Sequence, residues 1–169
     1  VLWHISIARP LNYHSAPPHT WWKAKEKPPE HPLPSSGTAD PGLFVRGDGG
    51  WAEGLHPWDR FVKNTYEILS PLNEMTSRMR MTDHAFVTAN RKVCRTVFGE
   101  GADAVEVTVN FGAPSYACRS KAGGQGVLGP NGFLVESAAF VAFSAAEFGG
   151  LAYPTAPLFT VRGTDGKPI

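Results

Sequence analysis

Residues 91–144 constrain the fold of this chain more than any other stretch. Within it, Val105, Val107, Val109 and Phe111 alternate with polar residues. Successive side chains of a β-strand point to opposite faces, so this alternation places the four apolar residues together on one face. We therefore predict a strand over residues 105–111 with one buried face. The polar residues assigned to the opposite face are Glu106, Thr108 and Asn110.

The neighbouring runs predict further strands around this one. Residues 92–98 form a β-branched run, and a short loop containing Gly99 and Gly101 joins it to the strand. Two such runs with a glycine-containing loop between them are typical of a β-hairpin. We therefore predict a mainly β fold, in which residues 83–169 form a truncated antiparallel β-sandwich. The other expected strands are residues 132–136 and 140–143, with weaker ones near Tyr116 and at 127–128, 151–153 and 158–162.

The first part of the chain, residues 1–82, has a different composition. All five tryptophans lie in its first 60 residues, and residues 9–42 contain eight prolines. Each proline fixes φ and removes a backbone donor, so this stretch is incompatible with a helix or a central strand. We expect a loop-rich segment packed over a site or another subunit. Short strands are predicted at residues 2–8 and 43–46.

A helix is predicted at the end of this segment. Apolar residues recur at three- and four-residue spacing over residues 57–69, and Pro57 stands at a suitable first position. Pro71 is expected to interrupt this helix, with Ser70 capping a second short one. Asp59 is assigned to stabilising the N-terminal end of the first helix. The change to strands places a domain boundary between residues 80 and 84.

Composition excludes several classes of function. The net charge of +1 gives no electrostatic footprint for nucleic acid, and no apolar run is long enough for a membrane helix. The histidines and cysteines show no metal-binding spacing, and no nucleotide-binding loop is present. We expect no cofactor and no bound metal. Cys94 and Cys118 are interpreted as two buried thiols or as one disulfide, and the sequence leaves both open.

The residues that carry the sandwich prediction also resemble a known family. The runs at residues 98–112 and 128–136 resemble the β-sandwich that closes many large bacterial glycoside hydrolases after their (β/α)₈ barrel. This resemblance implies that the chain is the C-terminal part of a longer carbohydrate-active protein. Residues 2–8, 43–46 and 57–69 would then be the last barrel elements. The resemblance also implies a secreted or periplasmic protein, whose partners are carbohydrate and the rest of the chain or another subunit.

Glycoside hydrolysis needs two carboxyl groups that flank the scissile bond. Asp48 and Glu53 are the candidate catalytic residues, because they follow an expected strand end in an aromatic-rich segment. Flat aromatic faces stack on sugar rings, and the candidate substrate-binding residues are Trp21, Trp22, Trp51, Trp58 and His56. An alternative function is a non-catalytic binding or assembly module, in which exposed aromatics and proline-rich loops contact another protein.

Overall fold

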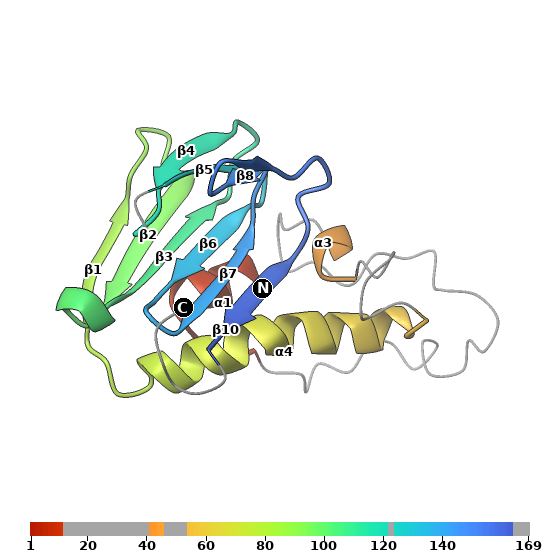
Figure 1. Ribbon diagram of the computed structural model, residues 1–169, viewed down its shortest axis with the longest axis horizontal. Coiled ribbons are helices and arrows are strands. Elements are labelled where there is room, and N and C mark those ends of the chain that lie inside the picture. The colour runs from red at the N-terminus through yellow and green to blue at the C-terminus, as the bar shows by residue number, and fades with distance from the viewer. Residues whose placement is uncertain (12–40, 46–53, 122–123, 164–169) are drawn as a thin grey trace.

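The computed structural model describes residues 1–11, 41–45, 54–121 and 124–163 (Figure 1). Its helices are α1 (Leu2–Ser6), α3 (Pro41–Val45) and α4 (Pro57–Thr76), and a short 3₁₀ turn spans Gly101–Asp103. The strands are β1 (Met81–Phe86), β2 (Val93–Phe98), β3 (Val105–Asn110), β4 (Tyr116–Arg119), β5 (Gln125–Leu128), β6 (Phe133–Glu136), β7 (Phe140–Ser144), β8 (Glu147–Phe148), β9 (Leu151–Ala152) and β10 (Phe159–Arg162).

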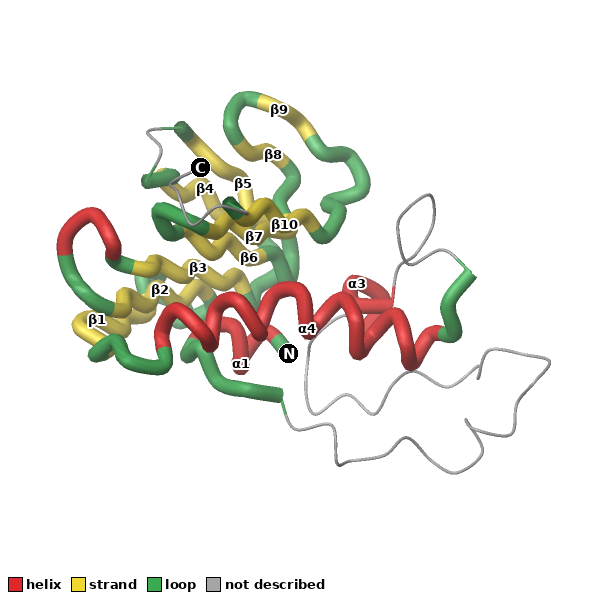
Figure 2. Tube along the Cα trace, turned by 60° about the horizontal axis from the view of Figure 1, so that its bottom comes forward, coloured by secondary structure: helices red, strands yellow, loops and turns green. Residues whose placement is uncertain are grey.

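These strands form two antiparallel sheets, which confirms the predicted mainly β fold. Sheet A has six strands in the order β1-β2-β3-β6-β7-β10, and sheet B has four in the order β4-β5-β8-β9. The predicted hairpin is present as β2 and β3, which pair along their whole length. Helices α1 and α4 lie on one face of sheet A, and sheet B lies across part of the other (Figures 1 and 2).

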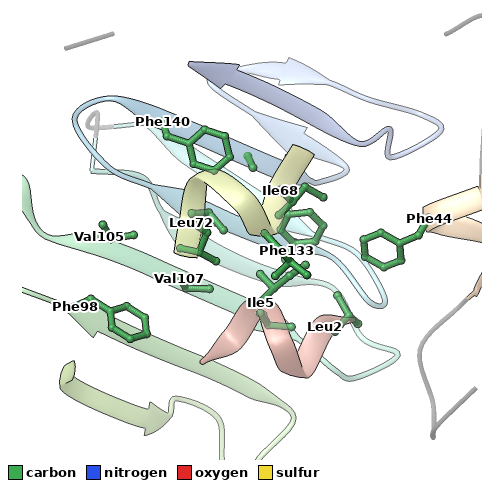
Figure 3. Close-up of a cluster of buried hydrophobic side chains, with 14 of the residues drawn as sticks. Leu2, Ile5, Phe44, Ile68, Leu72, Phe98, Val105, Val107, Phe133 and Phe140 are labelled. Atoms are coloured by element: carbon green, nitrogen blue, oxygen red, sulfur yellow. The ribbon is translucent and has the colours of Figure 1, made fainter. Parts of the chain in front are cut away.

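The larger hydrophobic core lies between sheet A and the helices. Val105, Val107 and Val109 point into it and are fully buried, as their alternation predicts. Ile5 of α1 and Leu72 of α4 meet them from the helical side (Figure 3). Full burial of one such side chain contributes about 1.5–3 kcal/mol, so this layer dominates the stability of the fold.

A smaller core lies between the two sheets. Leu134 and Phe143 project from the second face of sheet A and meet Leu128 of sheet B. The rings of Phe143 and Phe148 lie 4.6 Å apart, and Tyr153 packs edge-on against Phe143 at 5.3 Å. The central strands of sheet A are therefore covered by apolar contacts on both faces, whereas its edge strands β1 and β10 are largely exposed.

The prediction of a strand over residues 2–8 is wrong, because this segment forms helix α1. A helix places Leu2 and Ile5 on one side, where both are buried, and leaves Trp3 52% exposed. In a strand, the side chains of Trp3 and Ile5 would instead have pointed to the same face. The hydroxyl of Thr96 donates to the Ser6 carbonyl at 2.6 Å, which satisfies a carbonyl in the last turn of α1.

The strand predicted at residues 43–46 is also wrong, because residues 41–45 form helix α3. Leu43 and Phe44 are buried in the larger core, and Phe44 stacks on Phe133 of β6. The Asn64 side chain of α4 donates to the Phe44 carbonyl at 2.8 Å. The apolar run thus packs on α4, and it is not a member of either sheet.

Pro71 does not interrupt helix α4, contrary to the prediction. Proline inside a helix removes one hydrogen bond and typically costs about 3 kcal/mol. Ile68, Leu69 and Leu72 are nevertheless buried on one stripe that runs through this position. Burial of that stripe on sheet A offsets the lost hydrogen bond.

A charge on the helix-covered face of sheet A should unfold the protein. We expect Val107→Asp to lower the free energy of unfolding by about 3–5 kcal/mol, because Val107 is fully buried in the apolar core, where a carboxylate loses its hydration. Val161→Asp on the exposed strand β10 is the matched control and should change stability little. Urea denaturation measures both. A normally stable Val107→Asp protein would mean that the buried face has been misassigned.

Candidate functional site

The residues predicted to form the site lie mostly outside the described part of the chain. These residues are Asp48, Glu53, Trp21, Trp22 and Trp51. Trp58 lies in the first turn of α4, and the partly buried His56 immediately precedes that helix. Their roles in catalysis and substrate binding therefore stay predictions. The described part of the chain offers a different candidate site, between the two sheets.

This site is a cleft of about 500 Å³ between sheet A and strand β4 of sheet B. Its floor is formed by Arg95 of β2 and by Glu106 and Thr108 of β3. Its wall is β4 together with the two residues that follow it. The wall residues are Tyr116, Ala117, Cys118, Arg119, Ser120 and Lys121.

The floor is a network of charged side chains across three strands. Arg95 donates from Nε and Nη2 to the two carboxylate oxygens of Glu106, both at 2.7 Å. Its Nη1 donates to Asp83 of β1 at 3.1 Å. The hydrogen bond to Glu106 raises the pKa of the Arg95 guanidinium, so this group stays charged at all relevant pH values. The two parallel hydrogen bonds of such a pair fix the orientation of the guanidinium relative to the carboxylate, in addition to the attraction between the charges.

One end of β4 is held to sheet A by a buried carboxylate. Glu136 of β6 is 4% exposed and accepts hydrogen bonds from the Ser120 hydroxyl and from the Lys121 amide, the latter at 3.0 Å. The Lys121 ammonium donates to the Ala104 carbonyl at 2.6 Å. Glu136 pairs directly with Glu106 on the neighbouring strand β3. Separate donors on each carboxylate offset the repulsion that such a pair would otherwise cause.

The other end of β4 is held by a buried amide. Asn110, at the end of β3, is 1% exposed. Its Nδ2 donates to the carbonyls of Pro114, Leu128 and Gly129 at 2.8, 3.2 and 3.0 Å. Its Oδ1 accepts the Gly112 amide at 2.8 Å. We call Asn110 and Glu136 the two clamps, because they fix the β4–β5 hairpin over sheet A from both ends.

The two cysteines are free thiols on different sheets, so the structure favours the unbridged interpretation. Cys94 of β2 is fully buried near His84, and burial raises its pKa. Cys118 lines the cleft. Burial, and then the charge of nearby Glu136, raises the pKa of the Cys118 thiol to about 11. The thiolate is the nucleophilic form, so Cys118 is not an activated nucleophile at neutral pH.

The cleft is equipped for hydrogen bonding more than for covalent chemistry. Thr108 offers a hydroxyl on the floor, and half-buried Tyr116 offers a ring and a phenol on the wall. Among the described residues, no three histidine, cysteine or acidic side chains form a group able to hold a metal ion. No helix of the described chain is long and apolar enough to cross a membrane.

The sequence contained one signal for this site that the strand analysis did not use. Glu106 and Thr108 stand at the polar positions of β3, which were assigned to the opposite face without a partner. That face is covered by sheet B, so Thr108 is 5% exposed. Buried polar side chains on a central strand need partners, and this need marks a polar site between the sheets.

Comparisons with known proteins returned no match. No family profile, no curated protein and no solved structure matches this chain.

The Asn110 clamp can be tested by an isosteric change. Asn110→Asp replaces the amide donor by a carboxylate that faces three carbonyl oxygens, and we expect a loss of more than about 3 kcal/mol. Asn90→Asp is the control, because the side-chain oxygen of Asn90 accepts the Lys92 amide and an aspartate keeps this hydrogen bond. Chemical denaturation compares the two. Equal stability of both variants would contradict the clamp.

The Cys118 thiol gives a pH-dependent prediction. Below pH 9.0, the ordinary value, the thiol is neutral in both the folded and the unfolded states and contributes nothing to the pH dependence. Between pH 9.0 and about 11 it ionises only in the unfolded state, so folding stability falls as pH rises. Cys118→Ala should therefore show a shallower decrease in Tm over this range. Parallel Tm profiles for the two proteins would refute the raised pKa.

Proposed function

We propose that this chain is the C-terminal part of a carbohydrate-active, glycoside hydrolase-like protein, and that its β unit binds saccharide as a non-catalytic module. The observation that carries the proposal is the polar cleft between the sheets. A volume of about 500 Å³ lies within the range of about 300–1,000 Å³ that is usual for small-molecule sites. Its lining combines an aromatic ring with planar charged groups, which suits a ligand rich in hydroxyl groups.

The sequence resemblance supports the same assignment. Residues 98–112 contain β3, and residues 128–136 contain β6, so the similar residues are central strands of sheet A. These strands carry Glu106, Thr108 and both clamps. The likeness of the first segment to the end of a barrel depended on two predicted strands, and both of these segments are helices, α1 and α3. The proposal therefore rests on the β unit.

A binding role fits the carboxylates of the cleft better than catalysis does. Glycosidases need one carboxyl group free to protonate the leaving oxygen and a second free to attack or to activate water. Both oxygens of Glu106 are occupied by Arg95. Both oxygens of buried Glu136 accept hydrogen bonds from the residues that follow β4. Catalytic groups, if the whole protein is an enzyme, are expected elsewhere, with Asp48 and Glu53 as the predicted pair.

Saccharide binding to the 169-residue chain tests the proposal. Calorimetric titration with a panel of neutral and acidic oligosaccharides should find at least one ligand. Tyr116→Ala should weaken its binding by about tenfold or more, because the ring and the phenol both line the cleft. Tyr66→Ala, on an exposed position of α4, is the matched control and should bind normally.

Two results would count against this function. Failure of every saccharide to bind would remove it. Binding that Tyr116→Ala leaves unchanged would move the saccharide site out of the cleft and to the aromatic residues of the first segment.

An assembly module is the second candidate, and exposed apolar side chains on both edge strands of sheet A favour it. Phe86 of β1 is 45% exposed, and Phe159 and Val161 of β10 are 42% and 38% exposed. Exposed apolar side chains on strand edges are typical of surfaces that contact another chain. A chain that binds no saccharide but self-associates in sedimentation would support this candidate.

A further inference from the structure

The hydroxyl group of Thr108 is a buried polar group to which the described chain offers no partner. Thr108 lies on the central strand β3, is 5% exposed and lines the floor of the cleft. Among the described residues, none makes a hydrogen bond with its Oγ1, and this oxygen is not closed off from the cleft. A buried hydroxyl that makes no hydrogen bond costs free energy. This hydroxyl is therefore available to a molecule that enters the cleft.

The phenol of Tyr116 is a second hydrogen-bonding group of this kind. Exposure alternates along β4, so Tyr116 and Cys118 point toward sheet A. Within the part of the chain that the structure describes, the Tyr116 hydroxyl also has no hydrogen-bond partner. The cleft thus presents one uncommitted hydroxyl on its floor and another, next to an aromatic ring, on its wall.

The charged side chains below the cleft are already engaged with other groups. Arg95 pairs with both Glu106 and Asp83. Both oxygens of buried Glu136 accept hydrogen bonds from the residues that follow β4. A charged ligand would gain a counter-ion here only by separating one of these pairs. Removing one partner of such a pair leaves an uncompensated charge, which is strongly unfavourable in a buried place.

The cations of the wall do not face the ligand space. Arg119 is exposed, and the alternation along β4 turns its side chain to the face of sheet B that lies away from sheet A. The Lys121 ammonium donates to the Ala104 carbonyl at 2.6 Å, beyond the end of β4. Neither cation is placed to neutralise an acidic ligand inside the cleft.

We infer that the cleft takes an uncharged saccharide, and that the Thr108 hydroxyl binds it together with Tyr116. A sugar hydroxyl both donates and accepts hydrogen bonds, as do the hydroxyls of threonine and tyrosine, so these groups match in either direction. This inference rests on the proposed saccharide-binding function, and it specifies the ligand class and a residue that contacts the ligand.

Thr108→Val tests this residue, because valine keeps the shape of the side chain and removes the hydroxyl. The probes are trimers of glucose, xylose, mannose and N-acetylglucosamine, with galacturonate and glucuronate trimers beside them, titrated into the 169-residue chain. We expect a neutral trimer to bind and Thr108→Val to weaken its binding about tenfold. Thr108→Ser retains the hydroxyl and should bind within about twofold of the original chain.

Thermal unfolding separates a binding role from a structural one. Thr108→Val should not lower Tm, because the hydroxyl that it removes has no partner in the folded chain. Thr96→Val is the matched control on the neighbouring strand β2. The buried Thr96 hydroxyl donates to the Ser6 carbonyl at 2.6 Å and lies 2.9 Å from Nδ1 of His84. Thr96→Val should therefore lower Tm and leave saccharide binding unchanged.

The outcomes distinguish this inference from the function on which it rests. Unchanged binding by Thr108→Val, or a loss of Tm as large as that of Thr96→Val, would overturn the assignment of Thr108. Tighter binding of the acidic trimers than of the neutral ones would overturn the uncharged ligand. Saccharide binding by the chain would stand in both cases where a trimer binds. Binding of no trimer at all would remove the saccharide function itself.

Discussion

The structure depends on burying both faces of the central strands of sheet A, and two different kinds of interaction achieve this. The helical face is covered by apolar side chains around Val107. The other face is covered by sheet B, which the small core around Phe143 and the polar clamps Asn110 and Glu136 hold in place. Buried polar groups cost free energy unless all their hydrogen bonds are made. The hydrogen bonds of both clamps are made only when sheet B lies in this position, so the clamps also fix where sheet B lies.

Much of the β unit follows from local sequence. The alternation through β3 specifies which of its residues face the helices, and glycine-containing loops mark the hairpins. The period of apolar residues predicts most of α4, whereas α1 and α3 were harder to predict because their apolar runs are too short to reveal a period. Leu2 and Ile5 fit a helix face as well as Trp3 and Ile5 fit a strand face, and packing against sheet A decides between them. Pro71 was misjudged for the same reason, since burial of the surrounding stripe outweighs one local preference.

The cleft was beyond local sequence analysis because its residues come together only through strand pairing. Arg95 and Glu106 lie eleven positions apart and meet because β2 and β3 pair in one register. Glu106 and Glu136 lie thirty positions apart and become neighbours when β6 joins the sheet beside β3. A single sequence shows such residues as isolated charges, so the predicted site fell on the aromatic-rich first segment instead.

The attachment of sheet B by two end clamps and a small core has a consequence for how the molecule moves. The helices and the central strands of sheet A share one large apolar cluster. Sheet B instead contributes a few residues to a separate, smaller cluster. Regions with fewer buried apolar contacts open at lower free energy than the rest of a domain. Sheet B is thus the part that detaches first on mild heating. Because β4 is one wall of the cleft, a molecule in that state keeps most of its backbone structure but loses the cleft.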